Sequence, residues 1–482
     1  MSVQRAILGM MALFVMMTLM PSPATAIEGN LLLEILLEKG IITKDDLTQI
    51  KAEEKKREAA RAATHSRKTP QIEAGYGEET PAVAKTSEPS KKKDSGVKVG
   101  FGKKGFTLAT RDGLFKTKIQ WRFQGRYTYP ERSDPRNASA FSDNEESTFE
   151  LRRVRMKVGG HGYKPWIKYY FEVDWQPTNT SYSCCGDRTR LIDWRIMLEK
   201  YKWLKLRIGQ WKINYSRERV DSSGKQTMVE RSIMNRVFTI DRQVGMMLYG
   251  RVNPGTILDT NYYLGIYSGS GRATINDDDN MMYMGRIQWN VFGRELKWRQ
   301  SDVKYHKKPT ASISYGAYTV KGRCTRWSSS GCGQVSGFDR ATTDGQYQVS
   351  GMQVGSAMKY RGWSWQHETH WKQIKDTEAA AGDPDQERNM FGGYLQTGYF
   401  PHYLISAVPK PLEIAFRYSH VDPNVDAGGD LRQEFTTGLN WFFAGHRNKL
   451  TLDASHLTLE QPNPNLPAWT EQRVRLQWDV SF

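Results

Sequence analysis

The chain has 482 residues, of which 12% are aromatic and 42 are glycine, and its formal net charge is +17. No apolar run of membrane length occurs after the first residues, so a bundle of transmembrane helices is excluded and one large β architecture is favoured. A basic cytoplasmic protein would be a candidate for nucleic-acid binding, but the export signal described next excludes nucleic acid as a partner.

Residues 1–26 have the pattern of a secretory signal peptide. Arg5 precedes an apolar segment over 6–20, and a triplet of small residues follows at 24–26. The apolar segment is shorter than the roughly 20 residues that a membrane-spanning helix needs, which argues against an uncleaved anchor. We therefore expect cleavage after Ala26 and a mature protein outside the cytoplasm.

Two short helices are expected after the signal peptide. Apolar residues at helical spacing end at Gly40, and Thr43 with Asp46 resembles a capping box that opens a second, charged helix. We expect a periplasmic helical hairpin over 27–64, whose apolar face trimerises, docks on the following domain, or is only part of a solvated spacer. Prolines, a lysine run and few large apolar residues predict a disordered linker over 65–96.

From residue 97 the period of the sequence changes to two, the spacing of β-strands. Phe115, Ile119 and Trp121 share one face, and basic or amide side chains occupy the other. The same two-sided pattern recurs to Phe482. We predict sixteen strands, an even number, as single-chain bacterial barrels require. They lie near 114–129, 148–160, 166–177, 188–200, 204–212, 241–252, 256–268, 281–292, 309–321, 346–360, 363–375, 388–400, 410–421, 431–444, 449–461 and 471–482.

The connections and the two faces favour a membrane barrel over 97–482. Long and short connections alternate along the chain, with a long turn at 293–308 as the exception. A soluble multi-sheet protein is the alternative, but an aromatic outer face and a charged inner face leave nothing to bury except against lipid. We therefore predict an all-β fold, a sixteen-stranded antiparallel transmembrane β-barrel in the outer membrane. The terminal Phe482 is typical of proteins that the barrel assembly machinery inserts.

The faces that point into the predicted lumen are rich in basic side chains. An anion that crosses a pore loses hydration, and fixed positive groups in series compensate for that loss. Arginine suits phosphate because it donates two hydrogen bonds while keeping its charge. Glu172 and Asp174 fit the alternative, in which lumen charges of either sign only hydrate a wide pore. The candidate pore-lining residues of the strands are Arg122, Arg126, Arg153, Arg155, Lys157, Lys205 and Arg207.

The longest connection between well-defined strands, residues 213–240, is also basic and is the third external loop. Third loops of sixteen-stranded porins typically fold inward, so we expect this loop to form the narrowest part of the channel. An ordinary surface loop is the alternative. The candidate pore-lining residues here are Arg217, Arg219, Lys225, Arg231 and, just beyond, Arg242.

The cysteines and histidines indicate no cofactor. Cys324 and Cys332 would close a short loop and are a candidate disulfide in an oxidising compartment, whereas the pairing of the adjacent cysteines at 184–185 stays open. No CxxCH motif is present, so covalent haem is not expected. His367 and His370 fall on opposite faces of one predicted strand, which argues against a shared metal site.

Several short segments carry a family resemblance: 151–155 (Leu-Arg-Arg-Val-Arg), 209–212 (Gly-Gln-Trp-Lys), 216–219, 222–223, 230–232, Phe238, Arg242 and Gly245. In combination they resemble the phosphate-selective porins O and P, over roughly 97–482. The resemblance implies a trimeric channel for phosphate or polyphosphate. It also implies an inward third loop and a path lined by arginines and lysines.

Other functions are weighed against this one. A general-diffusion porin without phosphate specificity stays open, as does a structural or conduit barrel that encloses a partner. An enzyme on the barrel wall is not expected, because the histidines form no recognisable catalytic arrangement with a serine or an acid. The expected partners are phosphate or other small anions, outer-membrane lipid and lipopolysaccharide, the barrel assembly machinery, and further copies of the chain in a homotrimer.

Overall fold

The structure is a computed structural model that describes residues 96–482, except 103–104, 131–146, 176–188, 275, 277–278, 330 and 381–385. The chain divides into two compact units, Met1–Ser90 and Lys91–Phe482, and the described residues belong to the second. The predicted signal peptide, helical hairpin and nearly all of the linker lie outside the described residues. None of the helices that the structure describes is long and apolar enough to span a membrane.

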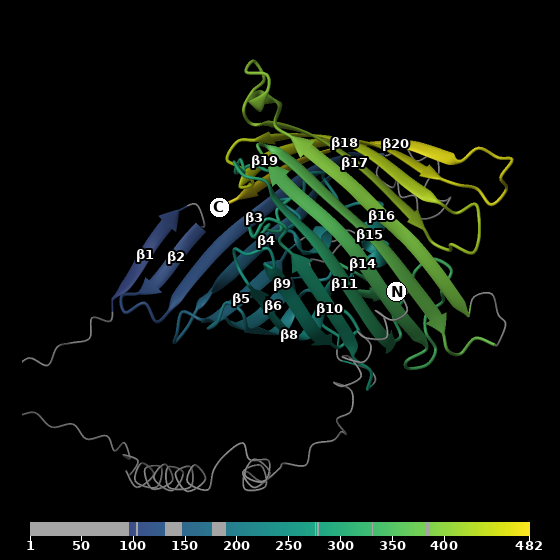
Figure 1. The fold of residues 1–482 in the computed structure, drawn as a ribbon, viewed down its shortest axis with the longest axis horizontal. Coiled ribbons are helices and arrows are strands. Elements are labelled where there is room, and N and C mark those ends of the chain that lie inside the picture. Colours follow the sequence, from purple (N-terminus) through teal and green to yellow (C-terminus); the bar gives the residue numbers. More distant parts are fainter. Residues whose placement is uncertain are drawn as a thin grey trace, which may run out of the picture. The chain divides into compact units, whose positions relative to one another are not determined.

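Eighteen strands of the described chain form one antiparallel sheet, and sixteen of them close into a β-barrel (Figure 1). Each barrel strand pairs with its neighbour in the sequence, and β20 pairs with β3 to close the ring. The barrel strands are β3 (Lys116–Tyr129), β4 (Thr148–His161), β5 (Ile167–Asp174), β6 (Arg190–Leu198), β7 (Lys205–Lys212), β8 (Arg242–Val252), β9 (Thr260–Tyr267), β10 (Met282–Trp289), β11 (Thr310–Gly322), β14 (Tyr347–Tyr360), β15 (Trp363–Asp376), β16 (Glu387–Tyr399), β17 (Leu412–Asp422), β18 (Arg432–Phe442), β19 (Asn448–Leu459) and β20 (Trp469–Ser481). A separate small sheet pairs β12 (Arg326–Ser328) with β13 (Gly331–Gly333).

The predicted sixteen-stranded fold is confirmed, and each predicted strand overlaps one strand of the barrel. On β20 the side chains of Gln477 and Asp479 are buried, whereas Val474 and Trp478 are 41% and 55% exposed. Polar side chains therefore lie inside and apolar side chains outside, which is the inverse of a soluble protein. Figure 1 shows β14 to β20 lying side by side as one tilted wall.

A short hairpin outside the ring was not predicted. β1 (Val97–Gly102) pairs with β2 (Gly105–Thr110), and β2 pairs in turn with the first residues of β3. Trp121 of β3 exchanges backbone hydrogen bonds of 2.7 and 3.1 Å with the C-terminal Phe482. The later residues of β3 thus pair with β20, and its first residues pair with the hairpin, which takes the place of β20 after the chain ends. Its strands are short and contain several glycines, which weakens the strand signal in the sequence.

Two long connections matter for the lumen. We use the name terminal end for the side of the barrel at which β3 begins and β20 finishes. Loop L3, residues 213–241, joins β7 to β8 at the opposite end. The inner turn, residues 290–309, joins β10 to β11 at the terminal end and contains the long turn that broke the predicted alternation.

Candidate functional site

Loop L3 lies inside the barrel rather than on its surface. It contains two short helices, α4 (Arg217–Val220) and α5 (Ile233–Phe238). The buried rings of Tyr215 and Phe238 contact the ring of His370 on β15, with centroid distances of 5.6 and 5.9 Å. L3 therefore buries apolar side chains against the inner wall, and this burial stabilises its inward position.

A carboxylate of the barrel wall holds the start of α4. Glu368 on β15 accepts a hydrogen bond from Ser216 Oγ (2.9 Å). The same carboxylate accepts the backbone N–H groups of Arg217 (2.5 Å) and Glu218 (3.2 Å). The first N–H groups of a helix have no partner within the helix, so Glu368 satisfies donors that would otherwise be buried without one.

Basic side chains of the same wall bind carbonyl groups of L3. Their strands, β15, β17 and β19, lie across the ring from β7, where L3 begins. L3 therefore crosses the lumen and narrows it. The three contacts join Lys372 Nζ to Val237 O (2.9 Å), Arg417 Nη1 to Glu230 O (2.8 Å) and Lys449 Nζ to Gln226 O (2.6 Å).

Five of the predicted pore-lining residues lie together on β3 and β4, and each has a carboxylate within 4 Å. Arg155 binds Asp174 (2.9 Å) and Glu172 (3.1 Å) of β5, so these two acids largely neutralise this arginine. The remaining pairs join Arg122 to Asp479 (3.3 Å), Arg126 to Glu230 (2.7 Å), Arg153 to Glu230 (3.6 Å) and Lys157 to Glu172 (3.8 Å).

The predicted basic residues in and next to L3 are held in two ways. Arg219 forms an ion pair with Asp241, and Arg242 pairs with Asp193 (2.5 Å). Arg231 instead donates to three backbone carbonyl oxygens of L3, at 3.0, 3.4 and 2.7 Å. A carbonyl partner positions a guanidinium without cancelling its full charge.

Lys225 of L3 has no ion pair within the part of the chain that the structure describes. Burial, together with the nearby cations Arg299 and Lys157, lowers the pKa of Lys225 to about 8. Burial and the neighbouring Arg219 lower the pKa of Arg231 to about 10. Both groups are therefore charged at neutral pH, and they lie among other cations, which produces a field that attracts anions.

The last three predicted residues lie over aromatic rings. Lys205 and Arg207 of β7 lie over the ring of Tyr249, with centroid distances of 5.6 and 4.7 Å. Arg217 of L3 lies over Trp298 of the inner turn, at 5.7 Å. An aromatic ring attracts a cation through its quadrupole and leaves the charge available to a solute.

Seven of the twelve predicted cations are buried, and the other five, Lys157, Lys205, Arg207, Lys225 and Arg231, keep part of their side chains exposed. Glu172 and Asp241 are buried. By contrast, Lys157 keeps 19% exposure of its side chain, and Arg207 is half-buried. Glu230, with 24% of its side chain exposed, is an exception. The five partly exposed cations are therefore the ones available to a solute, beside the partly exposed Glu230.

The inner turn also reaches L3, and this contact was not predicted. Gln300 of the inner turn accepts the backbone N–H of Thr227 (2.7 Å) and donates to Gln226 Oε1 (2.7 Å). Arg299 of the same turn forms an ion pair with Asp221. The unusual length of this turn was the one available signal in the sequence, but length alone does not show that a turn folds inward.

A third connection, residues 323–346, folds inward from the opposite end. A disulfide joins Cys324 to Cys332 beside the β12–β13 hairpin. Lys372, which binds α5, also donates to a backbone carbonyl of this connection (2.5 Å). L3 is thus held from both ends of the barrel, by the inner turn and by a disulfide-closed loop.

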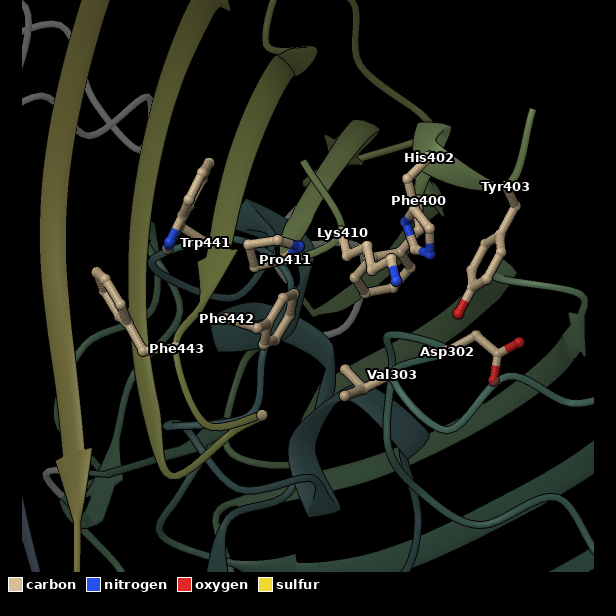
Figure 2. A pocket seen from close by; sticks show the side chains of 11 residues that line it. Asp302, Val303, Phe400, His402, Tyr403, Lys410, Pro411, Trp441, Phe442 and Phe443 are labelled. Carbon is tan, nitrogen blue, oxygen red and sulfur yellow. The ribbon is translucent and has the colours of Figure 1, made fainter. Parts of the chain in front are cut away.

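A cavity of about 510 Å³ lies among turns at the terminal end, and the inner turn contributes Asp302 and Val303 to its lining (Figure 2). Phe400, Tyr403 and Trp441 line much of it, together with Asp302 and Lys410. None of the predicted pore-lining residues lines this cavity. The described residues contain no group of three or more His, Cys, Asp or Glu side chains that could hold a metal ion.

Comparisons with known proteins agree with this architecture. A family model described as phosphate-selective porin O and P matches residues 118–482. No curated protein matches the chain significantly. The solved outer membrane channel DcaP of Acinetobacter baumannii is similar with a TM-score of 0.50 and 12% identity, over 78% of this chain and 99% of that one. This likeness supports the fold alone.

Two other solved structures are less similar. The anion-selective porin from Comamonas acidovorans has a TM-score of 0.46 and 11% identity, over 76% of this chain and 99% of that one. OprB of Pseudomonas putida has a TM-score of 0.46 and 8% identity, over 76% of this chain and 94% of that one.

Proposed function

This chain belongs to the phosphate-selective porin O and P family, and we propose that it is a passive diffusion channel for anions, with phosphate or polyphosphate as the preferred solute. Family membership and the barrel fold make the protein a porin of the outer membrane, and they favour a channel over an enzyme. The choice of solute depends on the chemistry of the lumen.

The observation that carries the proposal is a set of four half-buried cations, Lys205, Arg207, Lys225 and Arg231, none of which has a carboxylate within 4 Å among the described residues. Lys205 and Arg207 are half-buried, whereas Glu172 and Asp241 are buried. An anion in a narrow passage exchanges water for these fixed positive groups, and several weak sites in series let it leave again. A cation meets the same groups as a barrier.

We propose two roles for the predicted basic residues. Lys205, Arg207, Lys225 and Arg231 have no carboxylate within 4 Å among the described residues, so they are the proposed contacts of the passing anion. The cluster on β3 and β4 acts differently. Its ion pairs fix the shape of the wall, and its arginines keep the buried acids from repelling an anion.

The remaining features of the proposal follow from the predicted export of the chain. We propose that the signal peptide is removed after Ala26, that the terminal end and the N-terminal segment face the periplasm, and that the barrel assembly machinery inserts the chain. In the membrane the outer surface contacts lipid and lipopolysaccharide. A homotrimer is proposed from the family resemblance, and the migration of unheated protein in a detergent gel tests it.

A general-diffusion porin is the second candidate. The ion pairs of Arg155 with Asp174 and Glu172 favour it, because they remove much of the positive charge from one side of the lumen. A conduit barrel, which encloses a partner, would instead copurify with that partner and conduct no ions.

The test is single-channel current of the refolded protein in a planar bilayer, measured in potassium chloride while inorganic phosphate is added. Chloride current that phosphate blocks at low concentration supports a phosphate channel. Current without block supports a general porin, and no current supports a conduit role.

A further inference from the structure

Four strands of the wall place cations and aromatic rings in one register row. Lys205 of β7 is opposite Tyr249 of β8, Tyr249 is opposite Tyr263 of β9, and Tyr263 is opposite Arg286 of β10. The two tyrosine rings stack with a centroid distance of 6.5 Å and an interplanar angle of 7°. Because directly opposite residues have neighbouring side chains, the row joins the partly exposed Lys205 to the buried Arg286.

The row ends where L3 and the inner turn meet. Trp298 of the inner turn lies under the guanidinium of Arg286, at 4.8 Å, and also under that of Arg217, at 5.7 Å. Arg217 is fixed further because it donates to the backbone carbonyl of Lys297. The tryptophan therefore holds two guanidinium groups, one from the barrel wall and one from L3, at the same place.

The row continues past Arg286 through a glycine. Arg286 is opposite Gly316 of β11, and Gly316 is opposite Gln353 of β14. A Cβ at Gly316 would lie 3.1 Å from Gln353 Nε2 and 3.4 Å from Arg286 Cγ. The glycine thus lets the amide of Gln353 approach the arginine, which a larger residue would prevent.

These side chains carry hydrogen-bond donors that the described residues do not satisfy. The unpartnered donors are Nε and Nη1 of Arg286, Nε and Nη1 of Arg217, and Nε2 of Gln353, and the amide oxygen Oε1 of Gln353 is an unpartnered acceptor. Arg286 and Arg217 are only 2% and 3% exposed, and Gln353 is fully buried. Buried donors without acceptors are costly, and more so when they belong to a charged group, so the site favours an acceptor that carries negative charge.

Nearby carboxylates do not supply that acceptor. Glu368 acts electrostatically on Arg286, but its oxygens already accept the hydroxyl and backbone donors at the start of α4. Glu295 of the inner turn pairs with Arg251 and Lys297 instead. Within the described residues, neither Arg217 nor Arg286 has a carboxylate within 4 Å.

We propose that Arg217, Arg286 and Gln353 form an oxyanion-binding subsite, which the half-buried Lys205 and Arg207 connect to the terminal end of the lumen. The subsite deepens the proposed function and rests on it, since it identifies where an anion binds rather than only passes. Two guanidinium groups and one amide provide donors for a tetrahedral or carboxylate anion, and no internal ion pair has to break when the anion binds.

The test is the inorganic phosphate concentration that half-blocks chloride current through single refolded channels. Arg286→Gln removes one guanidinium, and we expect at least a tenfold higher concentration. Gln353→Leu removes a donor without changing the charge, and we expect at least a threefold higher concentration with an unchanged reversal potential. The matched control is Arg251→Gln, which removes an arginine of β8 that is paired with Asp259 and Glu295, and we expect less than a twofold change.

The outcomes separate the subsite from the general function. Wild-type channels that are not blocked by phosphate would overturn both. Block of the wild type with equal shifts in Arg286→Gln and Arg251→Gln, or with no shift in Gln353→Leu, would overturn the subsite alone. If Arg286→Gln does not refold, Arg286→Lys keeps the charge but loses donors, and an unchanged half-blocking concentration in that variant would equally overturn the subsite.

Discussion

Removal of the Glu368 carboxylate is expected to release the start of L3 from the wall. In the native protein Glu368 accepts three hydrogen bonds from L3, from one hydroxyl and two backbone N–H groups. A hydrogen bond to a charged group contributes about 1.5–3 kcal/mol. The three bonds share one acceptor, and water partly replaces them, so we expect Glu368→Ala to weaken docking by about 3–5 kcal/mol in total.

A loss of that size changes the ratio of docked to undocked L3 by about two to four orders of magnitude, since about 1.4 kcal/mol corresponds to a factor of ten. Other contacts, such as Lys449 with Gln226, still hold the middle of L3. We therefore expect partial undocking, seen in a bilayer as current that switches between the native conductance and a higher one. The wider pore should also discriminate less between chloride and potassium.

The matched control is Glu387→Ala on β16, where the exposed carboxylate accepts a hydrogen bond from Gln373 of the adjacent strand and forms no hydrogen bond or ion pair with the described residues of L3. This variant should conduct like the wild type. A correctly folded Glu368→Ala channel that keeps the native conductance and does not switch to a higher one would refute the account of how L3 is held.

Three further outcomes are expected. Because the pKa of Lys225 is lowered to about 8, this lysine is charged below that pH and neutral above it, so the chloride-over-potassium permeability ratio should fall between pH 7 and pH 9. Lys225→Arg should abolish this fall, and a variant with the same pH profile as the wild type would exclude Lys225 as the titrating group. Arg155→Gln should lower the same ratio in a bilayer at pH 7, because it removes one positive charge beside Glu172 and Asp174 in the lumen wall. An unchanged ratio would show that these acids do not act on the pore. Reduction of the disulfide between Cys324 and Cys332 should destabilise the 323–346 connection by about 2.5 kcal/mol, because the reduced chain gains entropy when unfolded. Limited proteolysis with and without reductant would detect this loss, and equal cleavage rates would contradict the prediction.

The barrel could be predicted from the sequence because its signal is local and repeated. In strands such as β20 the inward positions are polar and the outward positions apolar, as Gln477 and Trp478 illustrate, and this alternation requires no knowledge of which strands pair. The β1–β2 hairpin was missed for the converse reason. Its strands are short and rich in glycine, and they are recognised only through their pairing with β3.

The site was predicted only in part, because partners depend on register. Alternation places Arg155 and Asp174 on inward faces, but only the pairing of β4 with β5 sets them directly opposite each other. For the same reason, a single arginine on β10 gave no signal in the sequence. Arg286 becomes notable only when strand register and the inner turn bring Tyr263 and Trp298 against it.

Anion selectivity of the lumen is tested most directly by the zero-current potential of the refolded wild-type channel across a gradient of potassium chloride at pH 7. The partly exposed cations and buried carboxylates predict a zero-current potential of the sign that a chloride-selective channel produces. This potential should be larger at low salt than at high salt, because salt screens the electric field of the lumen charges. A potential with the sign of potassium permeation would contradict the account.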